Sequence, residues 1–325
     1  MSGSRADRAG PDWIAVDWGT SNLRAWAMDA DGRVMAEAAS ADGMGGLASP
    51  DAFAPALLKL VGDWLPPEGL PGGLSDPVPT VICGMAGART GWVEAPYLPV
   101  PCAPLDPARA ASPDAGPRLS VRILPGLSQA KPADVMRGEE TQIAGLIARR
   151  PRFDGVVCLP GTHTKWAHVS AEEVVSFRSF MTGELFALLS SASILRHGLA
   201  EEGGHASAGE DFAEALDAAM SRPEAAAASL FALRAEHLLH DLAPARARAR
   251  LSGLLIGLEL AASRPWWLGR EVALIGAPGP TAGYAAALEA QGVFLSRLDP
   301  AEATLDGLRA AHAALWPAAE APSAG

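Results

Sequence analysis

Two stretches far apart in the chain share one plan, in which an apolar strand leads through a short polar turn into a returning strand. The first runs from Trp13 to Met28, and the second from Gly155 to Val169. Because side chains alternate between the two sides of a strand, each unit can bury one face against a core. The repeat predicts two lobes of similar α/β architecture, whose polar turns could bind one polyphosphate from two sides.

Further strands and helices follow each of these units. The glycines, prolines and periodic apolar residues predict strands at Gly32–Ala39, Val78–Cys83, Val121–Leu124, Val174–Phe180, Glu271–Ile275 and Val293–Leu298. Helices are expected at Pro50–Leu65, from Gly138 onward, and at Thr182–His197, Glu210–Met220, Ala225–His240, Ala245–Ser263 and Ala301–Leu315. We expect an N-terminal lobe over 11–132, a C-terminal lobe over 133–300, and a C-terminal helix and tail over 301–325.

The first turn has the features of a phosphate-binding loop. Gly19, Thr20, Ser21 and Asn22 offer exposed backbone N–H groups and two hydroxyls to an anion. Asp17, just before the turn, offers a carboxylate to the magnesium ion that accompanies such an anion. An ordinary hairpin, in which Asp17 and Asn22 serve only the geometry of the turn, is the alternative.

Composition narrows the class of partner and the compartment. A formal charge of −11 disfavours nucleic acid and anionic membranes, because those partners require clustered Lys and Arg. Three widely spaced cysteines, no signal-peptide pattern and no long apolar run favour a cytoplasmic protein with a frayed N-terminal leader. The seven histidines show no compact metal-ligand spacing, so a transition-metal site is not expected.

Several long motifs resemble the 2-dehydro-3-deoxygalactonokinase family. In chain order they are Asp17–Trp26, Met136–Gln142, Pro160–Trp166, Met181–Leu185 and Leu251–Gly257, and the resemblance spans nearly the whole chain. It implies an α/β fold with two ribonuclease-H-like lobes, as in actin-like ATPases and hexokinase, with an ATP cleft between them. It also implies transfer of the γ-phosphate of ATP to the 6-hydroxyl of 2-dehydro-3-deoxy-D-galactonate, in D-galactonate breakdown.

The reaction needs a group that accepts the proton of the attacking hydroxyl. Glu139 and Glu140 open the expected helix, where the helix dipole favours an ionised carboxylate. The resemblance favours Glu139, by analogy with the acidic residue that opens the connecting helix in this superfamily. Either glutamate could instead merely complement the dipole, so the choice stays open. The implied cofactors are ATP and Mg²⁺, with Asp17 orienting the metal through water.

The other site predictions concern ATP and the sugar acid. The expected ATP-binding residues are Gly19, Thr20, Ser21, Asn22, Gly161, Thr162, Thr164, Gly276, Gly279 and Thr281. The last three lie in Gly276–Tyr284, which resembles an adenosine loop interrupted by Pro278 and Pro280. The expected substrate-side residues are Arg24, Gly45, Gly46, Arg89, Trp92, Arg137, His163, Lys165 and Arg178. One of these cations should meet the substrate carboxylate, although a structural or solvent-facing role is equally open for each.

Two alternative functions remain. The chain could phosphorylate another sugar acid, such as the gluco-epimer, because no residue spacing excludes it. It could also be a non-catalytic, ATP-gated interaction protein of the same fold. The chain lacks the G-x-x-x-x-G-K-[ST] motif, which disfavours a P-loop kinase. The expected partner is a small sugar acid, without nucleic acid or membrane, and a homodimer is left open.

Overall fold

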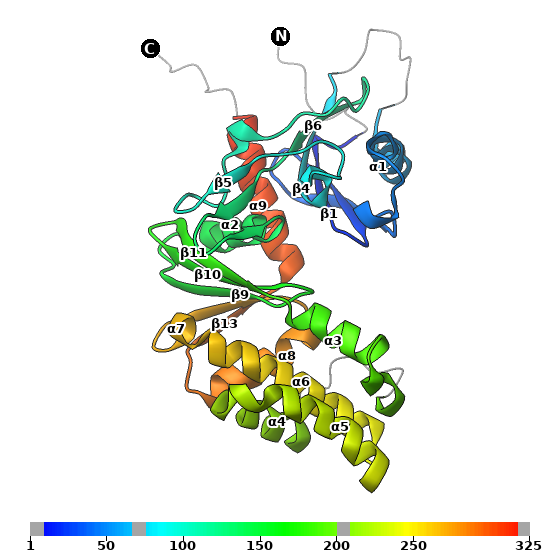
Figure 1. Cartoon of the computed structure of the whole chain (residues 1–325). Helices are drawn as coiled ribbons and strands as arrows, with labels where there is room; N and C mark the ends of the chain where they lie inside the picture. The colour runs from blue at the N-terminus through cyan, green and yellow to red at the C-terminus, as the bar shows by residue number, and fades with distance from the viewer. Residues whose placement is uncertain (1–9, 67–75, 200–208, 318–325) are drawn as a thin grey trace. The chain divides into compact units, whose positions relative to one another are not determined.

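The computed structural model describes residues 10–66, 76–199 and 209–317 and divides the chain into two compact units (Figure 1). The first unit contains the described residues up to Pro151 together with those from Ala301 onward. The second runs from Arg152 to Pro300. The expected N-terminal leader and the end of the C-terminal tail lie outside the described residues.

This division differs from the boundary expected at residue 132, because two helices of the first unit pack closely together. They are α2 (Glu139–Arg149) and α9 (Pro300–Leu315). A Cβ on Gly145 would overlap the backbone of Ala303 in α9, and a Cβ on Gly307 would overlap the backbone of Thr141 in α2. The helix that carries the two candidate glutamates, and the helix expected to stand apart as a C-terminal segment, therefore both belong to the first unit.

The first unit is built around a five-stranded sheet of order β3-β2-β1-β4-β6. Its strands are β1 (Trp13–Trp18), β2 (Leu23–Met28), β3 (Val34–Ser40), β4 (Val78–Gly84) and β6 (Leu119–Ile123). The β1 strand pairs antiparallel with β2 and parallel with β4. Alternation along β1 sends Ile14 and Val16 into a core shared with α1 (Phe53–Val61), and Trp13 and Ala15 into one shared with α9.

A second, smaller sheet in this unit was not expected from the sequence. It has the order β5-β7-β8, formed by β5 (Tyr97–Pro99), β7 (Gly126–Gln129) and β8 (Asp134–Met136). These strands are too short to show a clear alternation of apolar and polar residues. The β8 strand leads directly into α2, so the small sheet fixes the point at which that helix begins.

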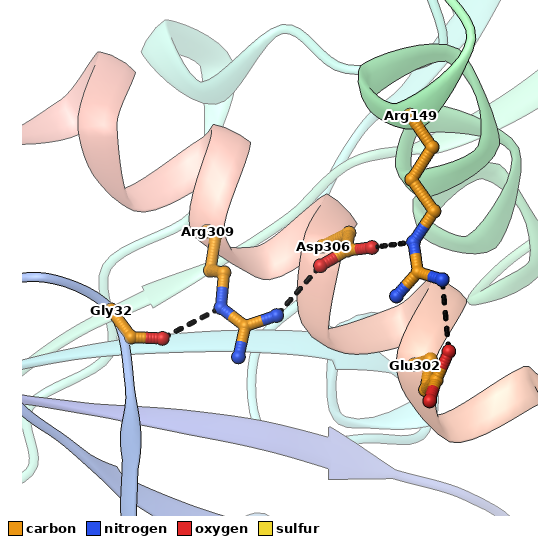
Figure 2. Close-up of polar contacts among 5 residues, drawn as sticks. All are labelled: Gly32, Arg149, Glu302, Asp306 and Arg309. Carbon is orange, nitrogen blue, oxygen red and sulfur yellow. Dashed lines mark hydrogen bonds and ion pairs between the residues drawn. The ribbon is translucent and has the colours of Figure 1, made fainter.

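Charged side chains attach α9 to the rest of the first unit (Figure 2). Arg309 donates to the carbonyl oxygen of Gly32 at 2.7 Å and to Asp306 at 2.6 Å. Arg149, at the end of α2, pairs with the same Asp306 and with Glu302 at 2.8 Å. These contacts link the β2–β3 turn, α9 and α2. They help to hold the C-terminal end of α2, whereas the candidate glutamates lie at its N-terminal end.

The second unit repeats the sheet plan of the first. Its strands are β9 (Gly155–Leu159), β10 (Thr164–Ser170), β11 (Glu173–Phe180), β12 (Val272–Ile275) and β13 (Leu295–Leu298). Their order is β11-β10-β9-β12-β13, with the same succession of antiparallel and parallel pairings as in the first unit. The helices are α3 (Thr182–Ser191), α4 (Glu210–Ser221), α5 (Ala226–His240), α6 (Pro244–Ala262), α7 (Arg264–Trp267) and α8 (Pro278–Ala290).

Apolar side chains of α4, α6 and α8 share a core with β9, β10 and β12 in the second unit. The predicted α/β class with two ribonuclease-H-like sheets is therefore confirmed, and each predicted hairpin forms. Among the helices that the structure describes, none combines the length and the apolar character needed to cross a membrane.

Candidate active site

Asp17 lies one residue before the end of β1, beside the predicted phosphate turn. In the strand register it faces Arg24 on β2 and Cys83 on β4. The Cys83 thiol donates to Asp17 Oδ1 at 3.8 Å. Burial raises the pKa of the Asp17 carboxyl above its usual value, whereas the positive charge of Arg24 and the thiol contact lower it. The sheet thus holds one partly buried acid next to one cation at the mouth of the turn.

The turn from Gly19 to Asn22 is closed and exposed. The Gly19 N–H donates to the Asn22 carbonyl oxygen at 2.9 Å, and the side chains of Thr20, Ser21 and Asn22 are exposed. The loop around Gly43 packs on this turn, because the Gly45 N–H donates to the Thr20 carbonyl oxygen at 2.8 Å. A Cβ on Gly43 would lie 2.5 Å from the same oxygen. The predicted substrate-side residues Gly45 and Gly46 therefore lie beside the predicted phosphate turn.

Two glycines with positive φ bring the start of α2 next to the end of β4. Gly84 has a φ of +89° and Gly138 a φ of +105°, conformations that residues with a Cβ rarely adopt. A Cβ on Gly138 would lie 3.5 Å from the Gly84 Cα. Because β4 is the neighbour of β1, this approach places the first turn of α2 near Asp17.

The two glutamates at this helix start have different surroundings. Glu140 is 0% exposed and accepts hydrogen bonds from the Gly138 N–H at 2.7 Å and from the Thr141 hydroxyl at 3.1 Å. Burial raises its pKa to about 8, with a further contribution from the charge of Glu139. Glu139 is only partly buried, and its Oε2 accepts a hydrogen bond from the Arg137 N–H at 3.0 Å.

The structure brings the three catalytic candidates of the sequence together. The charge of Glu139 raises the pKa of both Asp17 and Glu140, so the three carboxyls are electrostatic neighbours. Within residues 10–66, 76–199 and 209–317, no group of three or more His, Cys, Asp or Glu side chains is arranged to hold a metal ion. A magnesium ion here would accordingly need water and phosphate oxygens among its ligands.

The predicted substrate cations of the first unit differ in their surroundings. The Arg24 guanidinium lies 5.6 Å from the centre of the Trp26 ring. Arg89 is exposed and lies 3.6 Å from Glu94. Trp92 packs in the core cluster of Trp18, with ring centres 6.0 Å apart, so it helps to anchor the loop that follows β4.

Arg137 is the predicted cation with unsatisfied donors. Its guanidinium lies 4.3 Å from the centre of the Tyr97 ring, and its Nη2 donates to the Ala95 carbonyl oxygen at 2.8 Å. Its Nε and Nη1 are buried and have no hydrogen-bond partner among the residues that the structure describes. Buried donors without an acceptor are costly, which makes this guanidinium a candidate for binding an anion.

In the second unit the predicted phosphate turn is exposed, except for its last residue. Gly161, Thr162 and His163 are exposed, and Thr164 is fully buried. The Thr164 hydroxyl lies 3.0 Å from the Tyr284 hydroxyl, inside the unit. This burial favours a structural role for Thr164 over the direct phosphate contact expected from the sequence.

The start of α3 supports the exposed part of this turn. A Cβ on Gly183 would overlap the Gly161 carbonyl oxygen, and the Glu184 N–H donates to the Thr162 carbonyl oxygen at 2.9 Å. The His163 Nε2 lies 2.7 Å from a carboxylate oxygen of Glu184. The turn and the first residues of α3 therefore form one packed unit.

A pocket opens beside this turn. It is lined by Pro160, Gly161, Thr182, Gly183, Phe186, Ser252, Leu255, Ile256 and Tyr284. The Ser252 hydroxyl is buried and has no hydrogen-bond partner in the described part of the chain. The pocket lies against the turn that the sequence assigns to phosphate binding.

The predicted adenosine loop is mostly helical. The α8 helix begins at Pro278, a residue type favoured in the first turn, so Gly279 and Thr281 belong to a helix and not to a loop. The Thr281 hydroxyl donates to the Ala277 carbonyl oxygen at 2.8 Å, and a Cβ on Gly276 would lie 2.6 Å from the Thr281 methyl group. Among the side chains of this stretch that the structure describes, that of Tyr284 alone lines the pocket.

The remaining two predicted cations of the second unit also differ. Lys165 is buried on β10, and Arg178 is exposed on β11. Because Arg178 belongs to the edge strand of its sheet, solvent can surround its guanidinium. Neither residue lines the pocket.

Some residues of the site were not predicted from the sequence. Cys83 contacts Asp17, Ser252 lines the pocket, and Glu259 is a buried carboxylate on α6 beneath the second turn. A signal for Glu259 is present, because it is the one charged residue in the mostly apolar run from Leu251 to Leu260. A charge in such a run indicates a buried polar partner.

Comparison with known proteins gives consistent matches over the length of the chain. A family model described as 2-keto-3-deoxy-galactonokinase matches residues 17–311. A 2-dehydro-3-deoxygalactonokinase of Escherichia coli (strain K12) is 33% identical over 312 residues, which cover 93% of this chain and 98% of the relative.

Two further matches are at higher identity. A protein of Rhizobium meliloti (strain 1021), named "Probable 2-dehydro-3-deoxygalactonokinase", is 41% identical over 310 residues, covering 94% of this chain and 98% of the relative. A crystal structure of a Sinorhizobium meliloti protein given the same enzyme name is 41% identical, with a TM-score of 0.85. That match covers 96% of this chain and 99% of the other.

Proposed function

The chain belongs to the 2-keto-3-deoxy-galactonokinase family, and from that premise we propose that it phosphorylates the 6-hydroxyl of 2-dehydro-3-deoxy-D-galactonate. Family membership makes it an ATP-dependent carbohydrate kinase. The position of the phosphate, the place of the reaction in D-galactonate breakdown and a cytoplasmic location are parts of the proposal. The observation that carries it is the group of Asp17, Glu139 and Glu140 next to a closed, exposed turn.

In the first unit, the exposed turn would bind phosphate oxygens through backbone N–H groups and the hydroxyls of Thr20 and Ser21. Asp17 would orient a magnesium ion through water, and the ion would neutralise charge on the phosphates. Arg24, which faces Asp17 across the strands, would supply a further positive charge near the transferred group. Phosphoryl transfer depends mainly on such positioning and charge neutralisation.

We assign the base to Glu139. Glu140 is fully buried, and its carboxylate accepts bonds from Gly138 and Thr141 within its own turn. With a pKa of about 8, it holds its proton at neutral pH and cannot readily take another. Glu139 is partly exposed at the same helix start, so a substrate hydroxyl can approach it. Glu140 would then be a positioning residue that fixes the first turn of α2.

In the second unit, the exposed backbone N–H groups of Gly161, Thr162 and His163 would bind phosphate oxygens. The neighbouring pocket lined by Phe186 and Ser252 would receive the nucleoside, since apolar walls with a few polar groups suit such a ligand. Gly279 and Thr281 lie within the helix α8, so they would not contact the nucleoside in this arrangement.

For the substrate carboxylate we favour Arg137 over the other cations. Its buried Nε and Nη1 lack acceptors among the described residues, and a carboxylate offers two oxygens to a guanidinium. We expect Arg137→Ala to raise KM for the sugar acid at least about tenfold, since bonds to charged groups contribute this much. KM for ATP should change less than about twofold. Arg109→Ala, an exposed arginine of the same unit, is the control.

A direct assay tests the function. The purified chain receives Mg-ATP and, separately, the galacto- and gluco-epimers of 2-dehydro-3-deoxy-hexonate, and ADP release and product mass are followed. We expect turnover with the galacto-epimer and a product phosphorylated at O6, identified by ³¹P–¹H NMR. Faster turnover of the gluco-epimer would refute the substrate assignment. ATP binding without turnover of either epimer would favour an ATP-gated interaction protein.

A further inference from the structure

Glu259 is a buried carboxylate with no role in the reaction described so far. It lies on α6, is 2% exposed, and accepts hydrogen bonds from Trp166 Nε1 at 2.7 Å and from the Tyr284 hydroxyl at 2.8 Å. It also accepts a hydrogen bond from the Thr182 hydroxyl. A buried carboxylate is costly unless donors satisfy it, so its presence in a mostly apolar helix run calls for a reason.

The donors to Glu259 come from elements that support the second phosphate turn. Trp166 is on β10, the strand that follows this turn, and Thr182 begins α3, which packs on the turn through Gly183. Tyr284 is on α8 and contacts Thr164, the last residue of the turn. One carboxylate therefore connects β10, α3 and α8 to α6.

The direction of the protons in this network follows from the carboxylate. Burial raises the pKa of Glu259, and the hydrogen bonds from Thr182, Trp166 and Tyr284 oppose this by stabilising the ionised form. When Glu259 is ionised it can only accept, so the single hydroxyl proton of Tyr284 points to it. Tyr284 can then only accept from Thr164, whose hydroxyl is 3.0 Å away. The Thr182 proton is likewise directed at Glu259. The network therefore fixes Thr164 at the end of the turn and Thr182 at the start of the helix that packs on it.

We propose that Glu259 is a positioning residue for ATP, which holds the second phosphate turn in its binding conformation through Thr182, Tyr284 and Thr164. It contacts no ligand itself. The inference rests on the proposed function to the extent that this turn binds the phosphates of ATP. It predicts that changes in the network affect nucleotide binding and leave sugar-acid binding unchanged.

Glu259→Gln is the most informative variant, because it keeps the shape of the side chain but replaces one acceptor oxygen with an NH₂ donor. If the glutamine oxygen accepts from Trp166, its NH₂ group is directed at Tyr284 and Thr182, and those hydroxyls must turn their protons elsewhere. We expect the dissociation constant of Mg-ADP and KM for ATP to rise about tenfold, as for a lost bond to a charged group. KM for the sugar acid should stay within about twofold.

A matched pair of variants separates loss of the Thr182 hydroxyl from loss of folding. Thr182→Val removes the hydroxyl at nearly constant volume, and Thr182→Ser keeps it. We expect weaker Mg-ADP binding in the first and near wild-type binding in the second. Thr80→Val removes another buried hydroxyl, which donates to the Val78 carbonyl oxygen on β4 in the first unit, and should lower the melting temperature without changing Mg-ADP affinity.

Calorimetric titration of Mg-ADP separates this inference from the proposed substrate, because it needs no sugar acid. A wild-type chain that binds Mg-ADP but phosphorylates no sugar acid would refute the substrate, and the Glu259 and Thr182 variants would still decide the positioning role. Unchanged Mg-ADP affinity in Glu259→Gln and Thr182→Val, or an equal loss in Thr182→Ser, would overturn the inference. So would a wild-type chain that binds no Mg-ADP.

Discussion

The two hairpins follow the same sheet plan but differ in where the nearby acid lies. In the first unit Asp17 faces Arg24 across the strands and is partly exposed beside the turn. At the corresponding pairing of the second unit, Leu159 faces Lys165, and the acid beneath the turn is the buried Glu259. An accessible acid can meet a metal ion or a proton, whereas a buried acid can only organise its neighbours. We therefore propose that the first unit combines phosphate binding with the chemical step, whereas the second unit contributes binding only.

Among these variants, Glu139→Gln should cause the largest loss of kcat. The amide keeps the shape but cannot accept the proton, so we expect kcat to fall about a thousandfold, within the range that a general base contributes. Glu140→Gln replaces a carboxyl that is already protonated at neutral pH, so we expect a loss in kcat below about tenfold. Steady-state kinetics on both variants test the assignment of the base to Glu139. A larger loss of kcat in Glu140→Gln than in Glu139→Gln would contradict it.

Asp17→Asn should have the next largest effect. The amide removes the negative charge that orients magnesium, so we expect kcat to fall about a hundredfold, comparable to the loss of one electrostatic contact to a transition state. Raised magnesium concentration should recover part of the activity. Asp51→Asn, at an exposed acid of the same unit, is the control. Wild-type kcat in Asp17→Asn would refute the role of this carboxylate.

Alanine at the glycines that support the two turns should weaken ATP binding in both units. A Cβ on Gly43 would overlap the first turn, and a Cβ on Gly183 would overlap the second. We expect KM for ATP to rise about tenfold in each variant, equal to about 1.4 kcal/mol. A Cβ on Gly62 meets no atom within 4 Å, so Gly62→Ala is the matched control. An effect confined to one of the two turns would show that only that turn binds ATP.

The buried acid of the first unit should make stability depend on pH. The pKa of Glu140 is raised from 4.5 to about 8, so its favourable contribution is complete below pH 4.5 and is lost as pH rises towards 8. Relative to Glu140→Gln, wild-type stability should therefore fall by up to about 1.4 kcal/mol per pH unit in this window. Thermal unfolding at several pH values measures the difference. Parallel curves for the two proteins would contradict it.

The smallest effect is expected at the surface of the first unit. Arg149 pairs with Glu302 and Asp306 on α9 but is partly exposed, and such pairs contribute at most about 1 kcal/mol (Figure 2). Arg149→Ala should lower the melting temperature slightly and leave kcat unchanged. A large loss of kcat would show that these ion pairs position the first turn of α2.

The sequence predicted the parts of the fold that local patterns specify. Both hairpins formed where alternating apolar residues meet a polar turn, and α2 began beside Gly138 as its spacing indicated. The short strands β7 and β8 were missed, because pairing between them stabilises them and no pattern of their own does. The boundary was placed too early, since the packing of α2 on α9 joins residues that are far apart in the chain.

Candidate residues were harder to predict where their role depends on distant partners. Glu259 is 93 residues from Trp166 and 77 from Thr182, so no local pattern joins them. The difference between Glu139 and Glu140 is likewise one of burial, which neighbouring positions in a sequence do not reveal. Asp17 lies near the start of α2 because Gly84 and Gly138 approach each other closely, and these two residues are far apart in the sequence.

The different roles proposed for Glu139 and Glu259 are tested most directly by titrating Mg-ADP into the wild type, Glu139→Gln and Glu259→Gln. We predict that Glu139→Gln, despite its loss of kcat, binds Mg-ADP within about twofold of the wild type, because it removes only a proton acceptor. Glu259→Gln should bind about tenfold more weakly, as expected for loss of a bond to a charged group. The opposite order of affinities would contradict the proposed role of Glu139 as proton acceptor and of Glu259 as the residue that positions the second phosphate turn.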